Sequence, residues 1–321
     1  MVKFILMCGI SGSGKSTAAE RYKNAWEAEI VSSDAIRKEL YGDENDQEHN
    51  EQVFKEVGLR VRELLEQGEN VVQDATNLTY KDRLKALNNV SKLRDVYKVC
   101  VVMDTPIEEC IDRDQKRMRS VGADVIRHQV SKFNMPQYFE GWDSIRIGFE
   151  RKELKFNEDK ALDTFSLMRG FNQQNPHHKY DLATHCFLVY KNAESMKLDD
   201  IVCKAALFHD IGKLFTQKID ENGVAHYYNH ENWSAYYILS HPDIVEVESS
   251  DSLLFLLFIV NNHMHIREIE RSEKARKKHI TRWGETWYTN LVKFSECDNK
   301  GSGMTKEEHD KLKNGDIDEN K

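Results

Sequence analysis

Residues 4–17 read FILMCGISGSGKST, and this stretch decides the fold of the first half of the chain. Residues 4–8 form a short apolar run, which is suited to a buried parallel strand. Residues 9–16 fit the pattern G-x-x-x-x-G-K-[ST] at every fixed position. Glycines let backbone N–H groups turn toward phosphate oxygens, and the helix that follows adds the dipole of its N-terminus. The stretch predicts a strand, a phosphate-binding turn and a helix, in that order.

The same turn predicts a nucleotide cofactor. Lys15 can reach the β- and γ-phosphates of a nucleoside triphosphate, and the hydroxyl of Ser16 can hold Mg²⁺. We therefore expect ATP and Mg²⁺ in this half of the chain. The residues expected to contact them are Gly9, Ser11, Gly12, Ser13, Gly14, Lys15, Ser16 and Thr17.

Candidate strands continue along the first half and alternate with helical segments. They lie at 29–33, 71–73 and 97–103, and residues 53–65 carry apolar side chains at helical spacing. This alternation is typical of an α/β fold, a parallel sheet with helices on both faces. Carboxylates at the carboxyl ends of parallel strands open onto a ligand crevice. Three aspartates follow the candidate strands: Asp34, Asp74 and Asp104.

The residues after these strands are suited to phosphoryl transfer. Asp34 and Arg37 are three apart and share one face if a helix starts there. An aspartate near the γ-phosphate can accept the proton of an attacking hydroxyl, and an arginine can bind the acceptor's own phosphate. Asp74 and Asn77 can position the acceptor or the water shell of Mg²⁺. The first half is therefore predicted to be a compact phosphotransferase.

Three arginines form a candidate lid. Arg113, Arg117 and Arg119 lie in a segment that we predict to be a mobile helix. Arg113 and Arg117 are four apart and would share a face, so they can close over the transferring phosphoryl group.

The first half resembles the kinase domain of phage-type polynucleotide kinases, which phosphorylate 5′-hydroxyl ends. The resemblance is carried by four segments in this order: GISGSGKST, SSDAIRKEL, QDATNL and DTPIEECIDRDQKR. The resemblance spans roughly residues 1–150, and related small-molecule kinases share much of the pattern. The roles that it implies are ATP and metal binding for Lys15 and Ser16, general base for Asp34, acceptor binding for Arg37 and Asp74, and contact with the transferred phosphate for Arg117.

The pattern changes around residues 150–176, which are polar and lose strand character. We therefore predict two domains, 1–152 and 153–321. Apolar residues in the second follow helical spacing, which predicts an all-α domain.

Imidazoles and carboxylates recur in the second domain. His209 and Asp210 are adjacent at the end of an apolar run, where an aspartate needs a partner charge, a metal or water. His185 precedes them and Asp298 follows. This donor set suits Mn²⁺, Fe²⁺, Co²⁺, Ni²⁺ or Zn²⁺ better than Mg²⁺. Adjacent helical residues point about 100° apart, so the pair can serve one ion, or Asp210 can bridge two.

The series H…HD…D is the signature of the HD phosphohydrolase superfamily, which this half resembles over about residues 175–300. HKYDLATH and HDIGK also resemble the HD domain of bacterial tRNA nucleotidyltransferases, which favours RNA as a substrate. The resemblance implies that His185, His209, Asp210 and Asp298 bind a first metal, that His230 and His263 match the extra histidines of two-metal members, and that Lys213 lies near the substrate phosphate. His226 and His265 stay unassigned, and His177 and His178 are expected at the surface.

Charge and cysteine content limit the class of protein. The net charge is −8, so a nucleic-acid substrate needs a local basic groove. Residues 267–282 carry seven basic and three acidic side chains. This segment either contacts a phosphate backbone or forms a salt-bridged exposed helix. The six scattered cysteines are typical of a reduced cytoplasmic protein, and we expect neither a signal peptide nor a membrane span.

An enzyme that adds a phosphate is thus joined to one that removes a phosphate. If both activities acted on the same group of one small molecule, the pair would only consume ATP. If they act on the opposite ends of a nucleic-acid break, the two activities are complementary. The sequence favours an enzyme that phosphorylates 5′-hydroxyl ends and hydrolyses 3′-phosphate or 2′,3′-cyclic phosphate ends of RNA, or of DNA, for a separate ligase. The alternatives are a nucleoside or nucleotide kinase fused to an HD nucleotidase, and a pair in which one half only senses nucleotide. The formation of a homodimer stays open.

Overall fold

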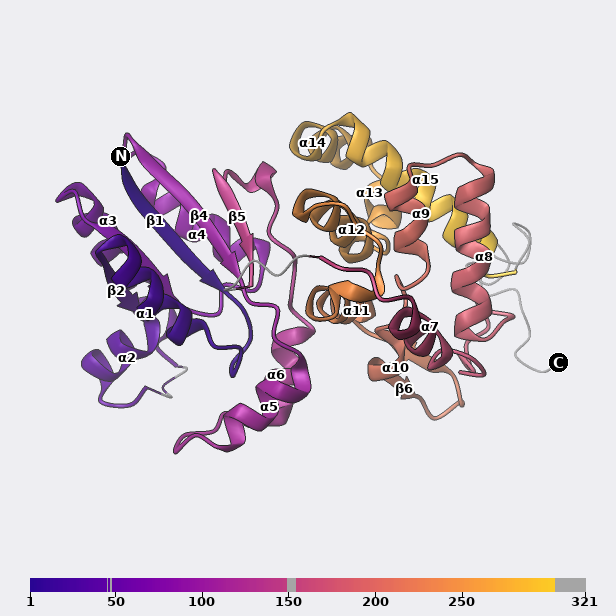
Figure 1. The fold of residues 1–321 in the computed structure, drawn as a ribbon, viewed down its shortest axis with the longest axis horizontal. Coiled ribbons are helices and arrows are strands. Elements are labelled where there is room, and N and C mark those ends of the chain that lie inside the picture. Colours follow the sequence, from indigo (N-terminus) through magenta and orange to yellow (C-terminus); the bar gives the residue numbers. More distant parts are fainter. Residues whose placement is uncertain (45, 47, 149–153, 304–321) are drawn as a thin grey trace. The chain divides into compact units, whose positions relative to one another are not determined.

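The computed structural model describes residues 1–44, 46, 48–148 and 154–303 (Figure 1). The chain divides into two compact units, Met1–Lys152 and Glu153–Lys321. No helix among the described residues is both long enough and apolar enough to cross a membrane.

The first unit is built on a five-stranded sheet in which every neighbouring pair is parallel. The strand order is β2-β3-β1-β4-β5, so the strand that precedes the glycine-rich turn lies at the centre. The predicted parallel α/β fold is confirmed for this unit. The strands are β1 Val2–Cys8, β2 Ala28–Ser32, β3 Asn70–Asp74, β4 Val96–Val102 and β5 Ser144–Ile147.

Helices cover both faces of this sheet. The chain moves one way from β1 to β2 and the other way from β2 to β3, so right-handed crossovers place their helices on opposite faces. Ile5 and Met7 of β1 pack with Ala18, Ala19 and Tyr22 of the helix that follows the glycine-rich turn. The helices are α1 Lys15–Trp26, α2 Ser33–Tyr41, α3 Asn50–Glu66, α4 Tyr80–Val90, α5 Ile107–Gln115 and α6 Ala123–Val130, with a 3-10 turn η1 at Tyr138–Glu140.

Local capping places the acidic residues at the carboxyl edge of the sheet. The side chain of Ser32, the last residue of β2, accepts a hydrogen bond from the N–H of Ala35, so α2 starts directly at the strand end. Asp34 therefore lies in the first turn of α2 and not on the strand. Asp74 is the last residue of β3, and Asp104 follows β4 by two residues.

The second unit is helical, with one small exception to the all-α prediction. Short strands β6 Gln217–Ile219 and β7 Ala225–Tyr227 form an antiparallel hairpin, which is too short to give a strand pattern in the sequence. The helices are α7 Glu158–Ser166, α8 Leu182–Ser195, α9 Asp200–Ala206, α10 Lys213–Thr216, α11 His230–Ser240, α12 Ser250–Asn262, α13 Ile266–Ile269, α14 Glu273–Trp283 and α15 Glu285–Gly301, with a 3-10 turn η2 at Pro242–Ile244.

Helix α12 forms the centre of this unit. Its buried residues run almost continuously from Leu253 to Asn261, because the helix is apolar on nearly all sides. It packs against α9, α11 and α15, while α8 packs against α9 and α15. Helices distant in sequence thus surround one core, and their inner faces meet.

A buried ion pair joins α4 to the 3-10 turn η1 in the first unit. The guanidinium of Arg83 is fully buried and donates to both carboxylate oxygens of Glu140, at 2.7 and 2.8 Å. Arg83 also donates to the carbonyls of Asn77 and Leu78, and the indole N–H of Trp142 donates to Glu140 at 2.9 Å. Breaking such a pair leaves an uncompensated buried charge.

We predict that Glu140→Gln lowers the free energy of unfolding of the first unit by about 3–5 kcal/mol. Amide hydrogen exchange of β1 and β4 measures this change, with α12 in the second unit as an internal standard. Glu39→Gln, which removes one of the two carboxylate partners of Arg60 at the surface, should leave the exchange unchanged. Equal exchange in the two variants would contradict the assigned role of Glu140.

Candidate functional site

The glycine-rich turn between β1 and α1 has the geometry of a phosphate cradle. Gly12 and Gly14 have φ values of +80° and +88°, which side-chain-bearing residues rarely adopt. A Cβ on Gly12 would also lie 2.2 Å from the carbonyl oxygen of Cys110. The sequence requires glycine here because of both the backbone conformation and this close approach.

Lys15 lies at the first position of α1 and folds back over the turn. Its ammonium donates to the carbonyl of Ile10 at 2.8 Å. Burial lowers the pKa of Lys15, and the carboxylate of Asp74 partly offsets this effect. Ser16 and Thr17 are exposed at the start of α1. The nucleotide-contacting residues expected from the sequence all lie in this one turn and the first residues of α1.

Two side chains outside the motif support the turn. Gln129 of α6 accepts from the N–H of Ser11 at 2.7 Å and donates to its hydroxyl at 3.0 Å. The hydroxyl of Thr105 donates to the carbonyl of Ser13 at 2.9 Å. Gln129 and Thr105 were not identified from the sequence, because neither lies in a recognisable motif.

Asp34 and Arg37 lie together on α2, as their spacing predicted. Arg37 is almost wholly buried and donates to the exposed carboxylate of Asp34 at 2.7 Å. It also donates to Asn50 at 3.0 Å and to the carbonyl of Glu44 at 3.3 Å. These contacts hold the carboxylate in place while leaving it open to a substrate.

The predicted arginine lid is only partly helical. Arg113 lies on α5, and its guanidinium is close to the cradle, 3.4 Å from where a Cβ on Gly14 would lie. Helix α5 ends at Gln115, so Arg117 and Arg119 lie in the following turn, and the prediction that Arg113 and Arg117 share a helix face was wrong.

That turn is held by a buried carboxylate. The hydroxyl of Ser120 and the N–H groups of Val121 and Gly122 donate to Asp114, which ends the helix early. Arg119 pairs with the carboxylate of Glu44 at 2.8 Å.

Asn77 differs from its prediction. It is buried in a left-handed conformation, with φ of 47°, and its amide donates to the carbonyl of Met7 at 2.8 Å. Its nitrogen therefore holds the loop after β3 against β1. Asp74, in contrast, lies at the strand end next to Lys15, as expected.

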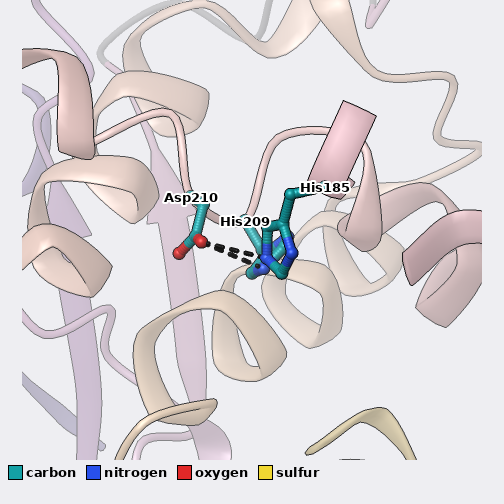
Figure 2. A group of neighbouring side chains, drawn as sticks. All are labelled: His185, His209 and Asp210. Carbon is teal, nitrogen blue, oxygen red and sulfur yellow. Dashed lines mark ion pairs between the residues drawn. The ribbon is translucent and has the colours of Figure 1, made fainter. Parts of the chain in front are cut away.

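The second unit brings six predicted metal ligands into one buried cluster. They come from five separate places in the sequence, and each is almost wholly buried. Figure 2 shows His185, His209 and Asp210 converging, with dashed lines for the two ion pairs that join the imidazoles to the carboxylate. The six candidate ligands are His185 of α8, His209 and Asp210 between α9 and α10, His230 at the start of α11, His263 after α12, and Asp298 of α15.

The carboxylate of Asp210 is shared between two groups of imidazoles. Its Oδ2 lies 3.3 Å from Nε2 of His185 and 3.5 Å from Nε2 of His209. Its Oδ1 lies 3.0 Å from Nε2 of His230 and 3.4 Å from Nε2 of His263. The two groups, His185–His209–Asp210 and Asp210–His230–His263, each have the compactness of a metal site.

Asp298 completes the first of these groups. Its Oδ1 lies 3.2 Å from Nε2 of His185 and 3.5 Å from Nε2 of His209. Burial raises the pKa of Asp298, but the charge of Arg267 and the contacts with His185 and His209 together hold that pKa well below its usual range. Asp298 thus places a second carboxylate on the side of the cluster that His185 and His209 occupy.

The tautomers of the histidines fit a bound cation. Nδ1 of His209, His230 and His263 each donates to a backbone carbonyl, at 2.7–2.8 Å. In the neutral ring each Nε2 then carries a lone pair that faces a carboxylate oxygen, and only a proton or a metal ion at Nε2 makes that contact attractive. Nε2 of His185 and His209 and Oδ1 of Asp210 lack a hydrogen-bond partner among the described residues. The donor set and these atoms fit one or two transition-metal ions.

The charged groups packed around His209 and Asp210 shift the pKa values of both residues. Burial opposes a charge on His209, but the carboxylate of Asp210 raises the pKa of His209 well above its usual value. Burial likewise opposes the charge on Asp210, but Lys213 and His209 hold the pKa of Asp210 well below its usual range. A metal ion bound at Nε2 would displace the proton that this raised pKa retains.

His209 and Asp210 lie in a turn and not at a helix end, since α9 already ends at Ala206. The turn is fixed by Gly212. Its N–H donates to the hydroxyl of Ser234 at 2.8 Å, and a Cβ there would lie 2.1 Å from the carbonyl oxygen of His230. Glycine thus lets the Asp210 turn pack directly on α11, which brings the two imidazole groups together.

Lys213 lies beside Asp210. Its ammonium is buried, 2.8 Å from Oδ2 of Asp210, and it donates to Gln173 at 2.8 Å and to Nε2 of His178 at 3.1 Å. The prediction that His178 is a surface residue was wrong. Its ring packs against His185, and burial together with the charge of Lys213 lowers the pKa of His178 to about 2.

The other histidines named in the sequence analysis lie outside the cluster. His177 is exposed, as expected. His226 pairs with Asp220 on the hairpin at 2.9 Å, and the half-exposed His265 lies 3.7 Å from Glu268. Gln173 was not identified from the sequence, because a polar residue in a loop gives no periodic signal. Arg267 was counted only as part of the basic segment 267–282, and it lies on the short helix α13.

The comparison with known proteins found a family match within the first unit. Residues 4–136 match a family model described as an AAA domain. With the sheet and the turn described above, this makes the first unit a P-loop kinase-like domain. No curated protein matches the chain.

Three solved structures are similar to the chain over less than half of its length. A chain of the Pnkp1/Rnl/Hen1 RNA repair complex is 26% identical, with a TM-score of 0.36, over 41% of this chain and 43% of that one. A sugar kinase from Janibacter sp. HTCC2649 is 16% identical, with a TM-score of 0.38, over 47% and 88%. The APS kinase CysC of Mycobacterium tuberculosis is 20% identical, with a TM-score of 0.36, over 47% and 90%. The match thus spans under half the length of the RNA repair chain.

We predict that Asp210→Asn abolishes binding of transition metal at both imidazole groups, because the two groups share this carboxylate. Asp298→Asn should weaken only the group that contains His185, so the variant retains part of the metal. Elemental analysis after incubation with Mn²⁺ and gel filtration measures metal per chain. Asp220→Asn, an exposed carboxylate beside His226, serves as the control. Equal metal content in Asp210→Asn and Asp220→Asn would exclude the shared ligand.

Proposed function

We propose that the chain is a bifunctional end-healing enzyme for nucleic acids. The first unit phosphorylates 5′-hydroxyl ends with ATP, and the second hydrolyses 3′-phosphate or 2′,3′-cyclic phosphate ends. The observation that carries the proposal is the presence in one chain of a phosphate cradle beside an aspartate–arginine pair and of a buried imidazole–carboxylate cluster with a shared Asp210.

The first unit has the groups that phosphoryl transfer needs. Backbone N–H groups of the cradle and Lys15 would bind the phosphates of ATP, and Ser16 would hold Mg²⁺. The carboxylate of Asp34 accepts the proton of the attacking 5′-hydroxyl, and Arg37 holds that carboxylate at 2.7 Å. Arg113 lies beside the cradle, where its charge stabilises the transferring phosphoryl group.

The second unit has the groups that phosphoester hydrolysis needs. Metal ions at the cluster would lower the pKa of a bound water and neutralise the phosphate oxygens. Nδ1–H bonds to backbone carbonyls orient the rings of His209, His230 and His263. Lys213, next to Asp210, carries the positive charge that a phosphate oxygen requires.

The combination favours a polymer with two different ends. A kinase and a phosphohydrolase that acted on the same group would only consume ATP. A broken strand instead offers a 5′-hydroxyl to one unit and a 3′-phosphate to the other, and both products are what a separate ligase joins. RNA is the favoured polymer, because the HD-like motifs resemble those of tRNA nucleotidyltransferases.

The direct test uses an RNA oligonucleotide with a 5′-hydroxyl and a 3′-phosphate or 2′,3′-cyclic phosphate, incubated with ATP, Mg²⁺ and Mn²⁺. Both ends should change, which mass spectrometry of the product shows. A matched DNA oligonucleotide measures the preference for RNA. If neither end changes while mononucleotides are phosphorylated or dephosphorylated, the chain is instead a nucleotide kinase fused to an HD nucleotidase.

We predict that Asp34→Asn slows the turnover of the kinase reaction by about 10²- to 10⁴-fold, because it removes the general base. Binding of ATP should persist, since Asp34 lies outside the cradle; equilibrium binding of a fluorescent ATP analogue measures it. Asp124→Asn, an exposed carboxylate on α6, is the control. Equal rates in the two variants would exclude Asp34 as the base.

We further predict that the two activities are separable. Lys15→Ala should abolish phosphorylation and retain hydrolysis of the 3′ end, whereas Asp210→Asn should do the reverse, because each variant alters the ligands of one unit only. Parallel assays of both ends measure this. Coupled loss in either variant would favour the alternative in which one unit senses nucleotide for the other.

A further inference from the structure

The segment 267–282 is locally basic in a chain whose net charge is −8. It spans α13 and α14 and the turn between them, which pack against α15 (Figure 1). Its sequence fits either a phosphate-binding surface or a salt-bridged helix. These two interpretations differ in whether its basic side chains are already paired.

The acidic residues of the segment leave most of its basic residues unpaired. Glu273 pairs with Lys277 at 2.7 Å, while Glu270 accepts from the hydroxyl of Tyr288. Within the described part of the chain, four exposed basic residues form no ion pair, and a salt-bridged helix would have paired them. These residues are Arg271, Lys274, Arg276 and Lys278.

Helix α14 presents its lysines on one side. His279 and Trp283 are buried against the unit, whereas Lys274, Lys277 and Lys278 are exposed at spacings of three and four residues. Residues at these spacings share a helix face. A membrane-binding helix would also need an exposed apolar face, but Trp283 of α14 points into the core.

The other end of the segment reaches the metal cluster. The guanidinium of Arg267 lies 2.5 Å from Oδ2 of Asp298, whose Oδ1 faces His185 and His209. Nε of Arg267 is buried and lacks a hydrogen-bond partner among the described residues, so it can still donate to a ligand. One short segment therefore links an arginine at the cluster with a row of exposed lysines.

We propose that segment 267–282 is the polynucleotide track of the phosphohydrolase site. Arg267 lies at the scissile end, and the lysines of α14 contact backbone phosphates farther along the strand. This inference rests on the proposed hydrolysis of nucleic-acid ends. Because phosphate contacts carry no sequence information, the track selects polymers over mononucleotides without selecting a base sequence.

The test compares full-length Lys274→Gln/Lys278→Gln with Lys191→Gln/Lys197→Gln, a control that removes the same charge from exposed lysines on and just after α8. The substrates are a single-stranded RNA with 5′- and 3′-phosphates and a 3′-mononucleotide. The α14 variant should raise the KM for the RNA on the order of tenfold, and the slope of log KM against log salt should fall by about 1.4, or 0.7 for each lost contact. The KM for the mononucleotide and the metal content should not change.

The outcomes separate the track from the proposed function. An unchanged KM for RNA in the α14 variant, with hydrolysis intact, overturns the track and leaves the function in place. If the wild type hydrolyses no phosphoester, fluorescence anisotropy of the same RNA still tests the track, and binding equal in both variants overturns it. Loss of sedimentation with phosphatidylserine vesicles in the α14 variant, with RNA binding unchanged, would make the surface a membrane site and also overturn the proposal.

Discussion

The second unit depends on a single buried carboxylate, that of Asp210. An aspartate without contact to water is costly unless opposite charges or metal ions compensate it. Here four imidazoles and the ammonium of Lys213 surround it. These groups come from α8, α10, α11, the residue after α12 and the segment between α9 and α10, so the carboxylate constrains how these elements pack. The requirement for glycine at position 212 follows from the same packing.

The first unit depends on a different constraint, the backbone of one turn. Its ligand groups are N–H donors of consecutive residues, and the glycines supply the dihedral angles that orient them. The parallel sheet then brings Asp74 and the start of α2 to the same edge as the turn. The two candidate sites are thus built in different ways, one from an oriented backbone and one from side chains gathered from distant helices.

The sequence predicted four of the five parallel strands, because buried strands have continuous apolar runs and the cradle is contiguous; the edge strand β5 is short and only partly buried, and it was not predicted. It failed where tertiary contacts override local preference. Arg117 lies outside α5 because Asp114 accepts hydrogen bonds from the next turn. His178 is drawn into the cluster by Lys213, and Asn77 is used to hold a loop. Neither the ligand roles nor the substrates are tested by the fold, and they stay predictions.

The sequence alone predicts a site when the residues of that site are neighbours in the chain. This holds for GISGSGKS and for the adjacent His209 and Asp210. Three other features could not be predicted from local sequence. They are the pairing of Asp210 with two separate imidazole groups, the position of Arg267 beside Asp298, and the unpaired lysines of α14. They join residues that are far apart in the chain or depend on which side of a helix is buried. Only packing of the helices around α12 decides them, because distance in space is not encoded in local spacing.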